Sequence, residues 1–145
     1  MNGSLGSPKS PSPDHWRRLT DARVARLATR NPTGGIDLVP FTFAVLDDRT
    51  IVSAVDHKPK RTQRLRRLDN IRAHPAVTVL ADHYEEDWAA LWWVRARGDA
   101  VVLDQPNEAH LDALMEKYEQ YRTQPPAGAA IVITVTELSG WAAAG

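Results

Sequence analysis

Short runs of β-branched and aromatic residues, each closed by a turn signal, constrain the fold of this chain more than any other feature. Residues 25–29 are followed by Asn-Pro-Thr-Gly-Gly at 31–35, and the run 36–46 is followed by Asp-Asp-Arg. Asn, Asp, Gly and Pro favour chain reversals. The next run, 50–55, begins directly after the second reversal. This pattern predicts a meander of hairpins and therefore an antiparallel sheet.

Three further strands are expected in the second half of the chain. Within residues 76–81, the side chains of Val77 and Val79 fall on one face of an extended segment. Residues 90–103 make a long strand or a bulged pair, in which Gly98 marks a bend. Residues 130–138 form the last strand.

Three helices are expected between the strands, because apolar residues recur at helical spacing in three segments. These segments cover residues 14–23, 64–73 and 104–121. Asp14 is expected to cap the first helix, and Val24 to continue its inward stripe. Strands in meander order with helices between them predict an α+β, barrel-like domain rather than a doubly wound parallel sheet.

Composition separates a tail from one domain and excludes several function classes. Residues 1–13 are mostly Ser, Pro, Gly and Asn, which predicts a disordered tail before a single domain at 14–145. The chain has no cysteine, which excludes thiolate nucleophiles and cysteine-ligated metals and fits the cytoplasm. It has no apolar run of membrane-spanning length and no signal-peptide stretch. We therefore expect a cytoplasmic protein without membrane contact.

The segment His57-Lys58-Pro59-Lys60-Arg61-Thr62 is a candidate anion site, since it lies after a strand and before a helix. Cationic side chains and the free N–H groups of a helix start both attract phosphate. Arg64 and Arg67 continue the positive charge along the helix and suit a longer polyanionic tail. The alternatives are a solvated basic loop and an ordinary exposed helix face.

The segment 88–97, WAALWWVRAR, is the second candidate. Strand alternation puts Trp93, Arg95 and Arg97 on one side and Trp92 on the other. Arginines beside a tryptophan can hold an anionic ligand against an aromatic wall. The same residue types are enriched at subunit interfaces, so an interface is the alternative. The two interpretations agree if the ligand lies between subunits.

Other chemistries find little support in the sequence. The acidic segment 82–87 contains His83, but no second histidine stands at ligand spacing, so no metal is predicted. No serine or threonine lies in a nucleophile-elbow motif, which speaks against hydrolase chemistry. Aromatic residues are not interleaved with the basic segment and the net charge is zero, so nucleic acid is not an expected partner.

Three segments together resemble the pyridoxamine 5′-phosphate oxidase-like superfamily. They read ARVARLATRNPTGGIDLVPFTFAV, IVSAVDHKPKRT and LRRLDNIRAHPAVTVLADHYEEDWAALWWVRARGDAVV. The resemblance covers about residues 14–141 and is nearest to the actinobacterial branch that depends on the deazaflavin coenzyme F420. It implies a six-stranded antiparallel split β-barrel with flanking helices. It also implies a homodimer with cofactor sites between the subunits.

The same resemblance implies which residues hold the cofactor. The strand segment containing Phe41 and Thr42 and the strand end containing Ser53 and Ala54 would line the ring. The phosphate would bind Lys58, Lys60, Arg61 and Thr62. Trp92 and Trp93 would come from a neighbouring element or from the partner chain.

The implied activity is hydride transfer from the reduced deazaflavin to a small organic acceptor. The cofactor carries the chemistry in such an enzyme, so no protein nucleophile is needed and no catalytic residue is assigned. Arg95, Arg97 or backbone N–H groups near Thr42 are candidates to stabilise developing negative charge, and Tyr84 is a candidate proton donor. The alternatives are an FMN-dependent oxidoreductase of the same fold and a non-catalytic carrier of flavin, deazaflavin or haem.

Overall fold

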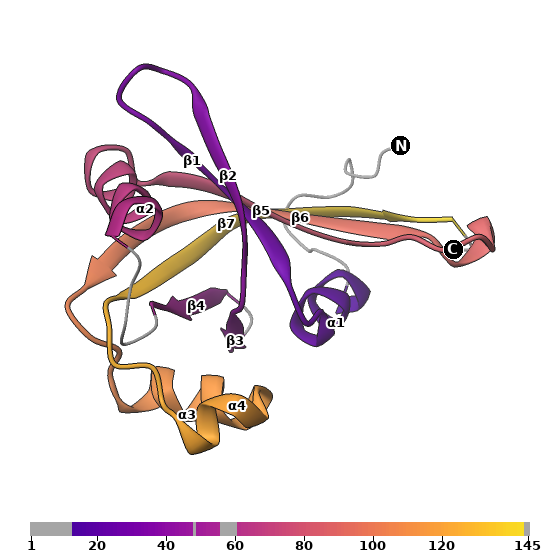
Figure 1. Ribbon diagram of the computed structural model, residues 1–145. Coiled ribbons are helices and arrows are strands. Elements are labelled where there is room, and N and C mark those ends of the chain that lie inside the picture. Colours follow the sequence, from indigo (N-terminus) through magenta and orange to yellow (C-terminus); the bar gives the residue numbers. More distant parts are fainter. Residues whose placement is uncertain (1–12, 48, 56–60, 144–145) are drawn as a thin grey trace.

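The computed structural model of the chain describes residues 13–47, 49–55 and 61–143, of which 61–65 are described by their backbone alone. Seven strands within these residues form one antiparallel sheet (Figure 1). Their order across the sheet is β2-β1-β5-β6-β7-β4-β3. The strands are β1 (Ala25–Arg30), β2 (Ile36–Phe41), β3 (Ala44–Leu46), β4 (Thr50–Ala54), β5 (Ala76–His83), β6 (Trp92–Leu103) and β7 (Ala130–Ala142).

The α+β class and the antiparallel pairing are confirmed, but the expected six strands are wrong, since the described residues form seven in an open sheet. The run 36–46 divides at Thr42 and Phe43 into β2 and β3, which lie at opposite edges of the sheet. Here the backbone of Phe43 bonds with the hydroxyl of Tyr118 instead of a neighbouring strand. The residues around the break still favour extended structure, so the sequence carries no signal for it.

The helices of the described residues differ from the expected ones mainly at their ends. They are α1 (Pro13–Asp21), α2 (Arg61–Ala73), the 3₁₀ turn η2 (Trp88–Ala90), α3 (Glu108–Lys117) and α4 (Glu119–Thr123). The expected helix 104–121 is divided because Tyr118 has extended backbone angles, and it begins late because Asn107 caps α3. Val24 lies beyond α1 and is exposed, contrary to the expected inward position.

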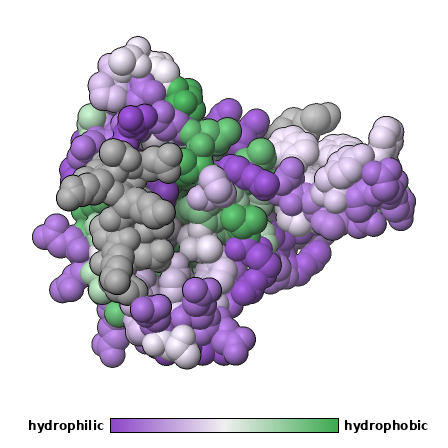
Figure 2. All heavy atoms as spheres, viewed as in Figure 1, coloured by the Kyte–Doolittle hydropathy of each residue, from purple (hydrophilic) through white to green (hydrophobic). Residues whose placement is uncertain are grey.

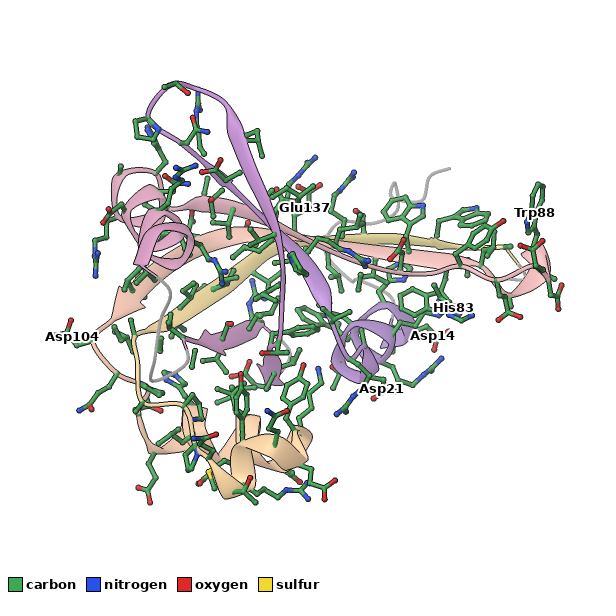
Figure 3. All side chains as sticks on the ribbon, in the orientation of Figure 1. Asp14, Asp21, His83, Trp88, Asp104 and Glu137 are labelled. Carbon is green, nitrogen blue, oxygen red and sulfur yellow. The ribbon has the colours of Figure 1, made fainter. Side chains whose placement is uncertain are left out.

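The strands β5, β6 and β7 extend past the rest of the sheet as a long arm, which points to the right in Figure 1. Pairing continues to His83↔Trp92 on one side of β6 and to Trp92↔Ala142 on the other. This ladder explains why β7 runs beyond the expected end at 138. Trp88 lies at the far end of the arm, away from α3 and α4 (Figure 3).

Side chains from one face of the sheet form the main core. Leu27, Val79 and Val94 are completely buried there, and Leu68 and Ile71 of α2 pack on the same cluster. Burying a Val, Leu or Ile side chain contributes about 1.5–3 kcal/mol each. A smaller cluster around Leu114 joins α3 to β3 and β4. The core therefore fixes α2 and α3 against the strands whose ends form the site described below.

Gly98 lies at the bulge that the sequence predicted. The register between β6 and β7 shifts between Arg97 and Gly98, and Thr136 is the residue that this shift leaves without a partner. A Cβ atom at position 98 would lie 2.2 Å from the backbone oxygen of Thr134. Only glycine lets the two backbones approach this closely.

The opposite face of β2, β1 and β5 remains exposed in the described part of the chain. Ile36 and Leu38 are 63% and 66% exposed. Their cross-strand partners are Arg30 and Ala28, which share their face, and Leu80 continues it on β5. We call Ile36, Leu38 and Leu80 the outer apolar face. Figure 2 shows hydrophobic surface gathered in the middle of the view, whereas the arm is hydrophilic to intermediate.

Candidate functional site

A cleft of about 420 Å³ opens where the ends of β2 and β4 meet, and we call it the split cleft. This volume falls within the roughly 300–1,000 Å³ range of small-molecule sites. The strand ends contribute Phe41, Thr42, Ser53 and Ala54 to its walls. The helices contribute Arg67, Tyr118, Gln120 and Tyr121. Residues from β2 at one edge of the sheet, from β4 next to the other edge, and from the helical segments around α2 and α4 therefore converge on one space.

Hydrophobic packing fixes the strand side of the split cleft. Phe41 is nearly buried and stacks on the fully buried Phe43, with 5.4 Å between the ring centres. Ser53 is also buried, and its hydroxyl donates to the backbone oxygen of Thr42 at 2.8 Å. This bond joins the end of β4 to the chain that leaves β2. The wall is therefore preformed rather than a gap between loose loops.

Tyr118 holds the helical side of the split cleft to the strands. Its hydroxyl accepts the Phe43 N–H at 3.1 Å and lies 3.0 Å from the Phe43 carbonyl and 2.9 Å from the Arg23 carbonyl. Burial raises the pKa of this phenol, an effect that the bond from the Phe43 backbone opposes. Tyr118 is therefore a neutral anchor for the passage between β2 and β3.

Tyr121 stands beside this anchor and meets its ring edge-on at 5.6 Å. Its hydroxyl lies 2.9 Å from the hydroxyl of Thr42, and either group can be the donor. Both residues line the split cleft and both are partly buried. The pair places polar hydrogens at a wall of the cleft that also carries the aromatic rings of Phe41 and Tyr118.

Lys117 lies behind the split cleft, against its aromatic wall. Its Nζ atom is 3.8 Å from the centre of the Phe43 ring and 5.3 Å from that of Tyr118. The Nζ atom is buried and has no hydrogen-bond partner. Burial, with a smaller contribution from the nearby Arg23 charge, lowers the pKa of Lys117 to about 8. Cation–π contact with the two rings partly compensates the charge for its lost hydration.

Arg67 lines the split cleft and also a second cleft of about 190 Å³, which we call the side cleft. Arg66, Asp37, Thr29 and Leu38 line the side cleft as well. The two spaces therefore share one cationic residue of α2. Arg66 is exposed beside the side cleft.

Asn70 fixes the geometry of the side cleft from within the core. It is 1% exposed, and its amide donates to the Thr29 hydroxyl at 3.0 Å and to Asp37 at 2.8 Å. Asn31 donates to the other oxygen of Asp37 at 3.2 Å. The bond from Asn70 is the larger cause that lowers the pKa of Asp37. This network attaches α2 to the β1–β2 hairpin and so sets the position of the neighbouring Arg67.

The structure brings together part of the predicted site. Phe41, Thr42, Ser53 and Ala54 all line the split cleft. Lys58 and Lys60 lie outside the described residues. Arg61 and Thr62 begin α2, but their side chains also lie outside the description. Arg67, which the sequence suggested for a polyanionic tail, does reach the cleft.

Trp92 and Trp93 do not line the split cleft in this single chain, since both lie on the arm. Trp92 stacks on His83 at 6.3 Å. The guanidinium of Arg95 lies 5.3 Å from the Trp93 ring, so the expected pairing of arginine with tryptophan is present. Tyr84, the sequence-based candidate for proton donation, is exposed and contacts Trp88 at the end of the arm.

Sequence reasoning missed the two tyrosines of the split cleft. The spacing of Tyr118 and Tyr121 was interpreted as the apolar stripe of one continuous helix. The missing signal is chemical, because buried tyrosine hydroxyls need hydrogen-bond partners that a purely apolar stripe does not offer. His110 completes the N-terminal capping box of α3, and burial lowers its pKa.

Two searches for other kinds of site gave negative results within the described ranges. No group of three or more His, Cys, Asp or Glu side chains stands close enough to hold a metal ion among these residues. No helix among them is long and apolar enough to cross a membrane.

Comparison with solved structures shows the fold of the chain. An F420 reductase shares 23% identity and a TM-score of 0.66, with 90% of this chain and 98% of that chain covered. The conserved hypothetical protein Rv2991 from Mycobacterium tuberculosis shares 19% identity and a TM-score of 0.71, with 92% and 86% covered. An FAD binding protein from Mycobacterium smegmatis shares 19% identity and a TM-score of 0.62, with 91% and 95% covered.

Comparison with curated proteins gave no match. Comparison with family models gave one that spans residues 13–142, which is nearly the whole chain. That model describes pyridoxamine 5′-phosphate oxidase, and the antiparallel sheet with its flanking helices agrees with the split barrel that the sequence predicted for this superfamily. The chain therefore belongs to the pyridoxamine 5′-phosphate oxidase family.

Proposed function

We propose that this protein is an oxidoreductase that binds a deazaflavin, coenzyme F420, in the split cleft and transfers hydride to a small organic acceptor. One observation carries the proposal: Phe41, Tyr118 and Tyr121 line a cleft of about 420 Å³, and Arg67 lines both this cleft and the side cleft. Family membership and the F420 reductase among the similar folds support the same cofactor class.

The residues of the split cleft fit a tricyclic ring with an anionic chain. Phe41, Tyr118 and Tyr121 offer aromatic surface, and Thr42 offers a hydroxyl at the same wall. Arg67 lines both clefts and is therefore a candidate to bind the anionic chain of such a cofactor. Guanidinium groups bind phosphate through paired hydrogen bonds, so Arg67 suits the first phosphate.

The second cleft favours the deazaflavin over FMN in this proposal. FMN carries one phosphate, whereas coenzyme F420 carries a phosphodiester and an oligoglutamate tail. Arg66 is exposed beside the side cleft and adds a positive charge beyond Arg67. Lys58, Lys60, Arg61 and Thr62 remain candidates for the same anionic groups. An FMN-dependent oxidoreductase is the second candidate.

When bound, the reduced cofactor supplies the hydride, and the protein supplies orientation and electrostatics. Phe41 and Tyr118 pack the ring and exclude water from it. Arg67 holds the anionic chain. The hydroxyls of Thr42 and Tyr121 contact the polar edge of whatever enters beside the ring. None of these roles needs a protein nucleophile.

We further propose that the protein is a homodimer whose subunits meet through the outer apolar face. Ile36 and Leu38 are large apolar side chains that lie on the same face and are more than half exposed. A group of exposed apolar side chains is typical of a surface that binds another protein. Pro40 and Val24 are exposed and also line the split cleft, so a second copy on this face would close that cleft from outside. Such a copy could bring its own Trp92 and Trp93 toward the cofactor.

The cytoplasmic location and the actinobacterial deazaflavin branch are parts of the same proposal. The sequence resemblance supports the branch, and the cysteine-free composition fits the location.

Paired titrations of the purified apo-protein with coenzyme F420 and with FMN, followed by fluorescence, test the proposal. Micromolar or tighter binding of F420 with much weaker binding of FMN is expected. Preference for FMN would favour the FMN-dependent oxidoreductase. If the protein binds neither cofactor, the proposed function is wrong. Tight binding without turnover of any acceptor would instead indicate a carrier of flavin or deazaflavin. If haem displaces the bound cofactor, the protein would be a haem carrier.

A further inference from the structure

We infer that the hydroxyls of Thr42 and Tyr121 form a donor site for the carbonyl oxygen of the small molecule that enters the split cleft. The inference deepens the proposed function, on which its redox part rests, by naming the substrate class as conjugated carbonyl compounds. The binding part stands on the cleft alone.

A count of protons around the split cleft identifies this pair. Thr42 and Tyr121 together carry two hydroxyl protons, and the 2.9 Å bond between them uses one. Whichever hydroxyl donates, the other keeps a proton for a further acceptor. That remaining proton lies at the wall of the cleft, because both residues line it.

The other hydroxyls of the split cleft already donate their protons to backbone carbonyl groups of the protein. Ser53 donates its proton to the Thr42 carbonyl at 2.8 Å. Tyr118 has one proton, which lies between the carbonyls of Arg23 and Phe43 at 2.9 and 3.0 Å. Among these hydroxyls, only the Thr42–Tyr121 pair offers a donor to a ligand without breaking a bond to the protein backbone.

The chemistry of the pair sets the kind of ligand group that it recognises. A partly buried hydroxyl donor is costly to leave without an acceptor, so it favours a ligand atom that accepts a hydrogen bond. A carbonyl oxygen meets this condition. The aromatic rings of Phe41, Tyr118 and Tyr121 favour a flat, conjugated body next to that oxygen.

The same pair completes the reduction of such a carbonyl compound. With a reduced cofactor bound, addition of hydride at the β-carbon of the conjugated system would form the C–H bond and move the displaced π-electron pair to the carbonyl oxygen. The Tyr121 hydroxyl donates its proton to that oxygen and is reprotonated through the Thr42 hydroxyl, which takes a proton from water. The acceptor gains two electrons and the cofactor loses two. Preformed donors at a developing oxyanion are a main source of catalysis.

A pair of matched fragments tests the donor site on the apo-protein. Acetophenone and α-methylstyrene have nearly the same shape, but only acetophenone has a carbonyl oxygen. Backbone amide shifts of the ¹⁵N-labelled protein give the affinity and the place of binding for both. We expect acetophenone to move the Thr42 and Ser53 amides and to bind about fivefold more tightly, as one neutral hydrogen bond gives.

Variants assign the effect to the pair. Tyr121→Phe keeps the aromatic ring and Thr42→Val keeps the shape, so both are expected to fold. Each single variant leaves one hydroxyl with its proton at the wall, so the double variant Thr42→Val/Tyr121→Phe is the one expected to abolish the preference for acetophenone. Thr42→Ser combined with Tyr121→Phe keeps one hydroxyl and should keep most of the preference. Thr136→Val, which removes an exposed hydroxyl of β7 outside the cleft, is the matched control and should leave the preference intact.

Three results would overturn the inference: equal affinity of the fragments for the wild-type protein, an undiminished preference in the double variant Thr42→Val/Tyr121→Phe, or loss of the preference in Thr136→Val. Because no cofactor is present, none of these results depends on whether the protein binds F420 or FMN. Failure of the proposed function would appear instead in the cofactor titrations.

Discussion

The hydroxyl of Tyr118 contacts both backbone groups of Phe43, accepting the N–H at 3.1 Å and lying 3.0 Å from the carbonyl oxygen. This contact joins α3 and α4 to the point where the chain passes from one edge of the sheet to the other. The split cleft exists because this passage is held in place, since Thr42 precedes Phe43 and lines the cleft.

Removal of this hydroxyl should therefore destabilise the fold. We expect Tyr118→Phe to lower the free energy of unfolding by about 1–3 kcal/mol, since it leaves the Phe43 N–H without its partner. Urea denaturation measures the change. Tyr84→Phe, the same deletion at an exposed site, should stay within about 0.5 kcal/mol of wild type. Equal stability of the two variants would contradict the anchoring role.

The buried Nζ atom of Lys117 should make stability depend on pH. Its pKa is about 8 in the folded protein and 10.5 as the ordinary value, so the unfolded chain binds more protons between these two pH values. Stability of the wild type should therefore rise relative to that of Lys117→Met as the pH increases above about 8. Below that pH the charge is present in both states and its desolvation cost is constant.

The variant Lys117→Met should accordingly be more stable than wild type at pH 7, by about 1–2 kcal/mol after discounting for partial solvent screening. The difference should shrink when urea denaturation is repeated at pH 9.5. A difference that is constant between pH 7 and 9.5 would mean that the Lys117 amine is fully hydrated. A variant less stable than wild type at pH 7 would mean that contact with the Phe43 ring outweighs desolvation.

Arg67 should control the affinity for the anionic part of the cofactor. We expect Arg67→Gln to weaken F420 binding about 10- to 100-fold, the range for a charge-assisted hydrogen bond, and to reduce the loss of affinity with salt. Arg72→Gln is the control on the same helix, since Arg72 pairs with Asp69 at 3.3 Å outside both clefts. If both variants weaken F420 binding equally, Arg67 attracts the cofactor only through the net positive charge of α2 and does not bind it directly.

The outer apolar face should mediate self-association. Leu38→Glu places a carboxylate at a position that is 66% exposed in the single chain, so the monomer should fold normally while a dimer would have to bury the charge. Sedimentation equilibrium should show a dimer for wild type and a monomer for this variant. Val101→Glu, at another exposed apolar position, should remain dimeric. A monomeric wild-type protein would contradict the proposed homodimer.

The sequence predicts most of the fold because its strongest signals are local. The turn at 31–35 and the bulge at Gly98 are present where the pattern placed them. The division of 36–46 was missed because extended residues do not show which strand they pair with. The extension of β7 to Ala142 was missed for the same reason, since its pairing partner on β6 is far away in the sequence.

The candidate site was predictable only where strand ends contribute to it. The family resemblance pointed to Thr42 and Ser53, and both line the split cleft, while their role as cofactor-binding residues stays a prediction. The tyrosines at the opposite wall depend on a helix break at Tyr118, which its extended backbone produces and which no proline or glycine signals. Their role follows from hydroxyl contacts that only three-dimensional packing creates.

Amide shift mapping during titration with coenzyme F420 tests the central claim most directly. The account predicts saturable changes concentrated at Phe41, Thr42, Ser53 and Ala54 and along α2 near Arg67, with one cofactor bound per chain. Shifts confined to the arm around Trp88, or no saturable shifts at all, would contradict the assignment of the split cleft as the cofactor site.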